Sequence, residues 1–343
     1  MIKRILSVFF VLLLLVAAYG GWRLLGPGTA FSGERRFLYI RTGTNYQQLL
    51  DSLRQDSLLQ SPAFFDWIAR KRDYPSNIKA GKYEIKKDMS LVDIIRMLRN
   101  GRQSPVRLFI TKLRTRETLA AIIGKKFECD SAEAMRFFES NDSLSAFGLD
   151  SNNFMTAILP DSYSFFWNTT PGAIYRKMFA GHKTFWTPQR RQQAAERGLN
   201  PSTAYILASI VEEETNAQAD KGKIASVYLN RIHKGMKLSA DPTVKFAMGD
   251  FELKRIYTKY TLTPSPYNTY LNPGLPPGPI CTPSQQTLTA VLESPKTDYL
   301  FFVAKPDLSG YSNFSSDYKE HLEYRKQYTQ ALDRRAGKTE AVK

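Results

Sequence analysis

Leu207-Ala208-Ser209-Ile210-Val211-Glu212-Glu213-Glu214-Thr215-Asn216 is a stretch whose pattern predicts an apolar helix that ends in three adjacent carboxylates. Residues on one face of a helix recur three, four or seven positions apart. Glu214 follows Leu207 by seven residues and Ile210 by four, so it continues the apolar stripe of this helix. We therefore expect the Glu214 side chain to lie toward the core.

This position has a chemical consequence for Glu214. A carboxylate that faces a core loses hydration, which raises its pKa, and a raised pKa is what a general acid needs near neutral pH. Glu212 follows Ala208 and Ser209 at the helical spacings, on a more weakly apolar side, and Glu213 is intermediate. Spacing alone leaves a second interpretation open, a solvated helix end or a cap partner, because ion-pair networks also perturb carboxylates.

The N-terminus predicts a membrane segment. Residues 5–22 are almost all apolar, and a helix needs about 20 such residues to cross a bilayer. Lys3 and Arg4 precede the run and favour a cytoplasmic N-terminus, so a single-pass anchor would leave the rest on the periplasmic or extracytoplasmic side of the cell membrane. Ala18-Tyr19-Gly20 offers a cleavage site, so a signal peptide is the alternative. The apolar run continues through Trp22, which favours an anchor.

Composition indicates a folded, basic protein. The chain is 43% hydrophobic and 13% aromatic, which supports packed cores, and its length after the anchor suits two or three domains. In an exported protein, the formal net charge of +16 suggests contact with anionic headgroups or wall polymer; a generic basic surface is the alternative. Export argues against nucleic acid as a partner.

The cysteines and histidines indicate no metal site. Cys129 and Cys281 are far apart in the sequence, and we expect two buried free thiols, although an oxidising compartment would allow them to pair. The three histidines are scattered, and no Cys, His or Asp spacing resembles a zinc site. The sequence also has no Gly-x-Ser-x-Gly elbow and no phosphate-cradling Gly loop. A mechanism without metal or cofactor is therefore expected.

The order of elements predicts an α+β fold in successive segments. We expect an anchor and its cytoplasmic tip at residues 1–25, a linker at 26–35, a small α+β module at 36–103, an intermediate α+β region at 104–198, a C-terminal α+β domain at 199–332 and a charged tail at 333–343. The module and the intermediate region should contain strands at 36–42, 81–85 and 106–110, helices at 46–54, 62–71, 91–99, 115–124, 131–139 and 171–186, and a buried aromatic core under a turn at Pro160-Asp161.

The C-terminal domain should open with a helix that begins at Pro201, a good helix start. Its other expected elements are a helix at 221–234, a turn at Asp241, a loop at 263–283, a helix at 284–292, a strand at 299–303 and a closing helix at 317–332. A loop of about twenty residues inside a compact domain is usually either functional or disordered. Here prolines stiffen the loop, and its Tyr and Asn side chains can bind sugar, which favours function.

Five ordered motifs in this domain resemble those of the MltG (YceG-like) endolytic murein transglycosylases. They are Ala208 to Thr215, Lys223 to Arg231, Asp241-Pro242-Thr243-Val244, Tyr267-Asn268-Thr269-Tyr270 and Gly274 to Ile280. The resemblance covers most of the chain. It includes the membrane anchor, a LysM-like module at residues 36–103 and an upstream block, Pro160 to Tyr163.

The resemblance implies an activity and its residues. In this family the catalytic acid is the second Glu of a Glu-x-Glu-Thr element, which falls on Glu214. The implied reaction cleaves the β-1,4 bond between N-acetylmuramic acid and N-acetylglucosamine and leaves a 1,6-anhydro-muramic acid end. Partnership with wall-synthesis enzymes is implied by the family alone. The candidate substrate-binding residues within the matching motifs are Asp241, Thr243, Tyr267, Asn268 and Tyr270.

Individual roles and two other functions remain open. Asp241 is interpreted either as a turn residue or as a residue behind the substrate contacts that orients the site, and Asn230 and Arg231 as stabilising the pair of helices. A hydrolase of the same glycan would use Asp241 or Asp161 as a second carboxylate, about 5–5.5 Å from the acid in a retaining enzyme. A glycan-binding envelope scaffold without turnover would use the LysM-like module instead.

Overall fold

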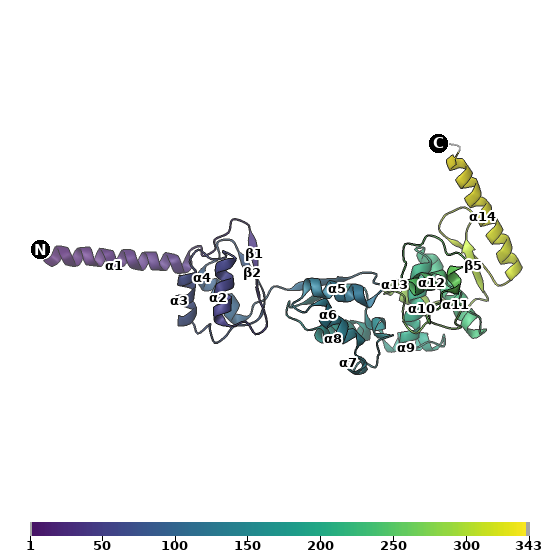
Figure 1. Ribbon diagram of the computed structural model, residues 1–343, viewed down its shortest axis with the longest axis horizontal. Coiled ribbons are helices and arrows are strands. Elements are labelled where there is room, and N and C mark those ends of the chain that lie inside the picture. The colour runs from purple at the N-terminus through teal and green to yellow at the C-terminus, as the bar shows by residue number, and fades with distance from the viewer. Residues whose placement is uncertain (1, 341–343) are drawn as a thin grey trace. The chain divides into compact units, whose positions relative to one another are not determined.

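The computed structural model describes residues 2–340 (Figure 1). Met1, in the expected anchor segment, and residues 341–343, in the expected tail, lie outside the described residues. The elements before residue 170 are α1 (Ile2–Leu25), β1 (Arg35–Ile40), α2 (Tyr46–Gln55), α3 (Pro62–Lys71), β2 (Gly81–Lys86), α4 (Leu91–Asn100), β3 (Val106–Ile110), α5 (Arg116–Lys126), α6 (Ser131–Glu139), α7 (Asn141–Ser145), η1 (Phe154–Ala157) and β4 (Asp161–Phe165).

The elements after residue 170 are mostly helical. They are α8 (Pro171–Phe185), α9 (Pro188–Ala195), α10 (Pro201–Glu214), α11 (Gln218–His233), α12 (Asp241–Met248), η2 (Tyr260–Leu262), α13 (Gln285–Leu292), β5 (Phe301–Ala304), β6 (Ser312–Ser315) and α14 (Tyr318–Glu340). The strands form three two-stranded sheets, β1 with β2, β3 with β4 and β5 with β6. This mixture confirms the expected α+β class.

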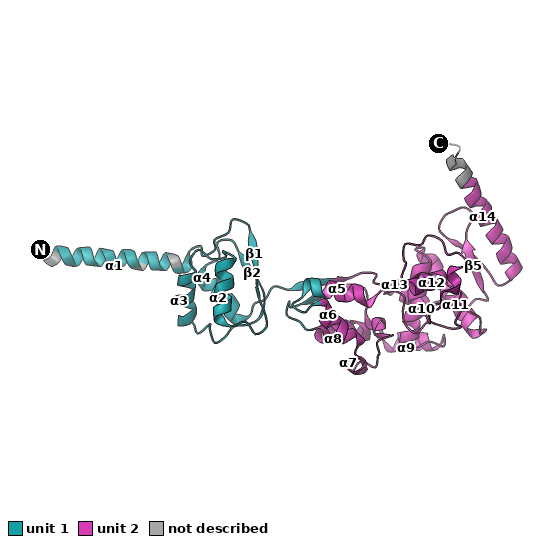
Figure 2. Cartoon of the chain, in the orientation of Figure 1, with its two compact units in different colours: residues 1–108, 124–130, 164–170 teal, residues 109–123, 131–163, 171–343 magenta. Residues whose placement is uncertain are grey.

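The chain divides into two compact units, which Figure 2 colours separately. Unit 1 comprises residues 1–108, 124–130 and 164–170, and unit 2 comprises residues 109–123, 131–163 and 171–343. The domain boundaries expected from the sequence, at residues 103 and 198, stay predictions.

The module in unit 1 has the expected order of strand, helix, helix, strand. β1 and β2 pair antiparallel, with Leu38 opposite Tyr83, and both side chains are buried. The helix α4 begins after Ser90, whose side chain accepts a hydrogen bond from the Asp93 backbone, and it ends at Gly101 with φ 67°, the left-handed conformation that glycine adopts freely. The likeness to a LysM module stays a prediction.

Helix α1 contains the apolar segment expected at the N-terminus. The stretch Arg4–Trp22 has 19 residues, a mean hydropathy of 2.3 and no buried part. Its length and composition suit either a membrane span or a signal sequence.

Unit 2 is built around α10, which packs against α11, α12 and α13 (Figure 1). A capping box starts this helix, because the Asn200 side chain accepts from the Thr203 backbone and the Thr203 hydroxyl accepts from the Asn200 backbone. Residues Ala204 to Val211 are all buried, so the helix fills the centre of the core. The sheet of β5 and β6 packs against α14.

Several expectations for the described elements were wrong. Asp241 was expected in a turn, but it is the first residue of α12, because Pro242 occupies the first turn of a helix as readily as a turn. The polar stretch at 187–198 contains α9, and β6 was not expected at all. At the predicted aromatic core, Tyr163 and Phe165 are buried as expected, whereas Asp161 is exposed. Both cysteines are buried and no disulfide joins them, which confirms that prediction.

Candidate active site

Glu214 is the last residue of α10 and continues its buried stripe. Leu207, Ile210 and Val211 are each 0% exposed, whereas Glu214 is partly accessible. Thr215 follows with φ −149° and ψ 145°, an extended conformation that ends the helix. The helix therefore brings one carboxylate from the core to the surface of unit 2 at a fixed position.

Helix α11 supplies the hydrogen-bond partner of this carboxylate. The Tyr228 hydroxyl donates to Glu214 Oε1 at 2.5 Å. Burial raises the pKa of Glu214 to about 7. The hydrogen bond from Tyr228 lowers this pKa, and so do the charges of Arg231 and Lys245, whereas the negative charge of Asp241 raises it further. The raised pKa expected from the helix stripe is thus confirmed. A carboxyl group with this pKa can both donate and accept a proton near neutral pH.

Glu212 has a different environment. Its Oε2 lies 2.8 Å from the Nζ of the buried Lys221 and accepts hydrogen bonds from Ser284 and Thr287. Burial alone would raise the pKa of Glu212. The charge and hydrogen bond of Lys221, together with the hydrogen bonds from Thr287 and Ser284, outweigh this effect of burial, so the pKa lies below its usual value. Glu212 is therefore ionised at neutral pH and ties α10 to α11 and α13.

Glu213 lies between two cations from the segment before α5. Its carboxylate is 3.0 Å from Arg114 Nη2 and 3.2 Å from Lys112 Nζ. Burial raises the pKa of Glu213, but Arg114 and Lys112 outweigh it, so this pKa is also lower than usual. Three adjacent residues of one type thus have three environments, and the raised pKa belongs to Glu214.

A cleft of about 930 Å³ opens at Glu214. Its lining also includes Tyr228, Arg231, Asp241 and Tyr270. This volume is in the upper part of the range of small-molecule sites, about 300–1,000 Å³, and suits an extended ligand. The cleft is therefore the candidate active site.

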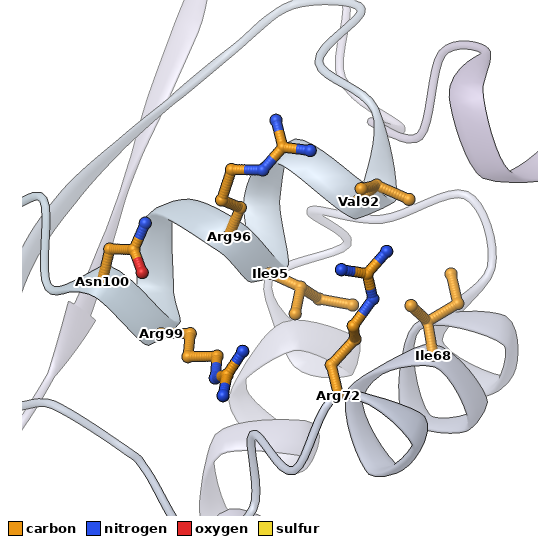
Figure 3. A pocket seen from close by; sticks show the side chains of 7 residues that line it. All are labelled: Ile68, Arg72, Val92, Ile95, Arg96, Arg99 and Asn100. Carbon is orange, nitrogen blue, oxygen red and sulfur yellow. The ribbon is translucent and has the colours of Figure 1, made fainter.

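A second cavity lies in unit 1, between α3 and α4, and Figure 3 shows its lining. Arg72, Arg96 and Arg99 surround it together with Ile68 and Ile95. Its volume of about 50 Å³ is too small for a sugar ring with its substituents. It has no carboxylate in its lining, so it offers no general acid.

Two of the five predicted substrate-binding residues line the cleft beside Glu214. Asp241 is exposed at the start of α12, and the Tyr270 hydroxyl donates to Asp241 Oδ1 at 2.6 Å. Tyr267 is partly buried outside this lining and packs on Phe246, with ring centroids 4.7 Å apart. The roles of all three stay predictions.

The other two predicted residues, Asn268 and Thr243, are 0% exposed. The Asn268 amide donates to the carbonyls of Thr261 and Thr263 at 3.0 and 2.8 Å, and its Oδ1 accepts from the Tyr270 backbone. In this way Asn268 holds the loop that places Tyr270. Its contact with a substrate stays a prediction.

Thr243 has a similar place under α12. Its hydroxyl donates to the Ala240 carbonyl at 2.6 Å and lies 2.9 Å from the Thr269 hydroxyl. These bonds join the start of α12, where Asp241 is exposed, to the loop that carries Tyr270. A direct contact between Thr243 and a substrate also stays a prediction.

Two residues of the cleft, Tyr228 and Arg231, were not among the site residues predicted from the sequence. Tyr228 lies in the helix expected at 221–234 but was given no role there. A buried tyrosine hydroxyl needs a polar partner, and that requirement was the available signal. Arg231 was expected to stabilise the helix pair, and that role stays a prediction. Its guanidinium donates to the carbonyls of Leu300 at 2.7 Å and Leu238 at 2.6 Å, so it fixes the cleft wall.

Asn230 was also expected to stabilise the helix pair. Instead its amide donates to the carbonyls of Thr297 and Tyr299, both at 2.9 Å, in the segment before β5. Unpaired carbonyls outside regular structure need donors, and this segment obtains them from α11. Among residues 2–340, no group of three or more His, Cys, Asp or Glu side chains could hold a metal ion.

Comparisons with known proteins agree on one family. A sequence model described as the YceG-like family matches residues 38–327. The chain is 26% identical over 323 residues to the endolytic murein transglycosylase of Bacillus subtilis (strain 168), covering 90% of this chain and 89% of that one. It is 27% identical over 344 residues to the protein of the same name from Streptococcus pneumoniae serotype 2 (strain D39), covering 88% of this chain and 61% of that one.

A solved structure is also similar. The crystal structure of a yceG-like protein from Listeria monocytogenes superimposes with a TM-score of 0.56 and 26% sequence identity. The match covers 85% of this chain and 99% of that one.

Proposed function

The chain belongs to the YceG-like family, and from that premise we propose that it is an endolytic peptidoglycan lytic transglycosylase in which Glu214 is the catalytic acid and base. The relatives from Bacillus subtilis and Streptococcus pneumoniae are both named endolytic murein transglycosylase. One observation carries the residue assignment. Burial in the cleft raises the pKa of Glu214 to about 7, while ion pairs hold the pKa values of its two neighbours below the usual range.

The first step breaks the glycosidic bond. Because Tyr228 occupies Oε1, the proton of Glu214 is carried on Oε2, the oxygen left for the substrate. Glu214 gives this proton to the glycosidic oxygen as the bond to C1 of N-acetylmuramic acid breaks and an oxocarbenium-like transition state forms. The leaving N-acetylglucosamine departs with a free 4-hydroxyl group. Burial raises the pKa of Tyr228 well above its usual value, so its hydroxyl remains a donor throughout.

The second step closes the anhydro ring. Glu214, now a carboxylate, removes the proton from the C6 hydroxyl of the same muramic acid, and O6 bonds to C1. Glu214 is thereby returned to its acid form, and no water is consumed. The nucleophile belongs to the sugar itself, so the step gains the high effective molarity of an intramolecular reaction. One carboxyl group is sufficient for this chemistry.

The structure supports different roles for the predicted substrate residues. Asp241 and Tyr270 line the cleft and are proposed to contact the glycan there. Asn268 and Thr243 are proposed to hold the loop and α12 that present these two side chains, since both are buried and fully hydrogen-bonded to backbone or neighbouring hydroxyls. Tyr267 is proposed to hold the loop against Phe246.

A hydrolase of the same bond is the second candidate, because Asp241 lines the cleft with Glu214. Its charge is close enough to raise the pKa of Glu214. A retaining hydrolase places its second carboxylate about 5–5.5 Å from the acid. Asp161, the other acid considered, is exposed and does not line the cleft.

The products of digestion decide between the two reactions. Purified murein is incubated with the full-length chain, and the masses of the released fragments are measured by mass spectrometry. A transglycosylase leaves ends that are one water lighter than the reducing ends left by a hydrolase. If no fragments are released, the chain is neither a transglycosylase nor a hydrolase, which is the result expected of a glycan-binding scaffold.

The role of Glu214 is tested by Glu214→Gln, with Glu213→Gln as the matched control. The amide keeps the shape of the side chain but has no acidic proton, so we expect cleavage to be lost while glycan binding and the circular dichroism spectrum are retained. Glu213→Gln makes the same chemical change one residue earlier and should retain cleavage. Cleavage by the Glu214 variant, or equal loss in both, refutes the assignment.

Helix α1 is proposed to be a single-pass membrane anchor that leaves both units on the extracytoplasmic side. The apolar stretch Arg4–Trp22, none of it buried, supports this proposal. The mass of the chain isolated from cells tests it. An intact N-terminus and resistance to alkaline extraction from membranes are expected, whereas a mass that lacks the α1 residues identifies a cleaved signal sequence.

A further inference from the structure

One wall of the cleft is aromatic and basic, and the reaction described above makes no use of it. Phe301 of β5 and three residues of α14, Tyr318, His321 and Arg325, contribute to this wall. The Phe301 ring stacks on His321 with centroids 5.2 Å apart, and Tyr318 packs on Phe301 at 5.4 Å. Tyr318 is 56% exposed, so much of its surface remains available to a ligand.

This β5–α14 wall is directly connected to the catalytic residue. Phe302 meets the Tyr228 ring edge-on, with centroids 6.0 Å apart. The Arg231 guanidinium lies 5.4 Å from the centroid of the Phe301 ring. Tyr228 in turn holds Glu214. A glycan that places one linkage at Glu214 can therefore place a neighbouring sugar against the wall.

The cleft also carries positive charge, on Arg325 of the wall and on Lys237 of the loop before α12. Arg325 and Lys237 both line the cleft and are exposed. Within the part of the chain that the structure describes, neither side chain forms an ion pair or a hydrogen bond. The two acids of the cleft have other partners, since Tyr270 donates to Asp241 and Tyr228 to Glu214. A ligand with its own carboxylate would complement this arrangement.

We propose that the β5–α14 wall is a subsite for a sugar that bears a carboxylate, which stacks its ring on Tyr318 and pairs its charge with Lys237 and Arg325. This inference rests on the proposed function and specifies the substrate of that same site. In peptidoglycan the carboxylate has two sources, the lactyl group of a peptide-free muramic acid or the stem peptide. Both present the same anion to the two cations.

The test measures binding to the full-length Glu214→Gln chain, so that the probes are not cleaved. Three tetrasaccharides of alternating N-acetylglucosamine and N-acetylmuramic acid serve as probes: one with free lactyl carboxylates, one with stem peptides, and one with its lactyl carboxylates capped as methylamides. The charge preference is the ratio of the Kd of the capped probe to that of a charged probe. We expect this preference to fall by about fivefold in K237Q/R325Q, as two exposed ion pairs allow, and to weaken with added salt.

The control variant, K319Q/K326Q, removes the same charge from exposed positions of α14 that do not line the cleft. It should retain the preference. Y318A should weaken all three probes by about fivefold, whereas Y318F, which keeps the ring, should not. A preference that survives in K237Q/R325Q, or falls equally in the control, overturns the proposal.

Preference for the peptide-free probe identifies the lactyl group as the anion, and preference for the peptide-bearing probe alone identifies the stem peptide. Either result supports the subsite. Absence of murein cleavage by the wild-type chain would instead refute the proposed function, which the binding assay does not measure.

Discussion

The Tyr228 hydroxyl donates a hydrogen bond of 2.5 Å to Glu214 Oε1, and these two residues come from different helices, α10 and α11. The contact stabilises the carboxylate form and so limits how far burial can raise the pKa of Glu214. It also leaves Oε2 without this bond, as the proposed proton transfer requires. The contact between the two helices therefore moderates the acidity that burial gives Glu214 and fixes the orientation of its carboxyl group.

Replacing Tyr228 by Phe should move the alkaline limb of the pH–rate profile upward. The variant keeps the ring against Phe302 but removes a hydrogen bond to the charged form, so the pKa of Glu214 rises above about 7 and the acid form persists to higher pH. A hydrogen bond to a charged group contributes about 1.5–3 kcal/mol, so we expect a shift of about one pH unit. The measurement is kcat/KM against pH. An unchanged limb contradicts the role of Tyr228.

Replacing Asp241 by Asn should move the same limb in the opposite direction. The negative charge of Asp241 raises the pKa of Glu214, so its removal lowers that pKa and the acid form is lost at lower pH. We expect a shift of less than about one pH unit, because Asp241 is exposed and solvent screens its charge. Product masses are recorded alongside the pH profile. Complete loss of turnover together with reducing ends in the wild-type digest would identify Asp241 as the second carboxylate of a hydrolase.

Glu212→Gln and Glu213→Gln should differ in their effects on stability. Glu212 neutralises Lys221, which is 6% exposed, so its loss leaves a buried charge without a partner and costs about 3 kcal/mol. Glu213 pairs with Lys112 and Arg114, whose side chains are 36% exposed, so its loss costs about 1 kcal/mol. Urea-induced unfolding measures both values. If the two variants lost the same unfolding free energy, the burial of Lys221 would not be the reason for the larger effect.

These two ion pairs also predict the response to acid. The pKa values of Glu212 and Glu213 are lower in the folded chain than in the unfolded one. The two ion pairs therefore contribute fully to stability above about pH 4.3, the pKa of a glutamate in the unfolded chain. This contribution is lost as the pH falls through the lower pKa values that Glu212 and Glu213 have in the folded chain. The difference in unfolding free energy between the wild type and Glu212→Gln should shrink below pH 4. A difference that stays constant with pH excludes ionisation as its cause.

Glu214 should contribute to stability with the opposite sign. Its folded pKa of about 7 lies above the unfolded pKa of about 4.3, so between these values the folded state binds more protons and stability falls as the pH rises. Glu214→Gln has no group to ionise and should gain about 2 kcal/mol relative to the wild type between pH 5 and pH 8. Thermal unfolding at both pH values provides the comparison. A constant difference would mean that the Glu214 pKa is close to its ordinary value.

Much of the fold was predictable from local patterns. The helical spacing of Leu207, Ile210 and Val211 placed Glu214 on a buried stripe, and the structure confirms both the helix and the direction of the pKa shift. Pro201 marked the start of its helix correctly. These features depend on residues within a few positions of one another, which is the range that periodicity and capping rules cover.

The missed elements lacked such local signals. The helix α9 is polar, and Ala194 is its one buried residue, so no apolar stripe marks it. The strand β6, Ser-Asn-Phe-Ser, has no alternation of apolar residues and depends on its pairing with β5. Tyr228 acquires its role from Glu214, 14 residues away on another helix, through a turn whose geometry the sequence did not specify. Partners that meet only in the folded chain cannot be identified from spacing.

The burial that gives Glu214 its pKa of about 7 exists only when α10 and α11 have come together. Before assembly the same side chain has the ordinary acidity of a glutamate and is ionised at neutral pH. An unfolded chain therefore lacks a carboxyl group that holds its proton at neutral pH, and it acquires one only when these two helices have packed together.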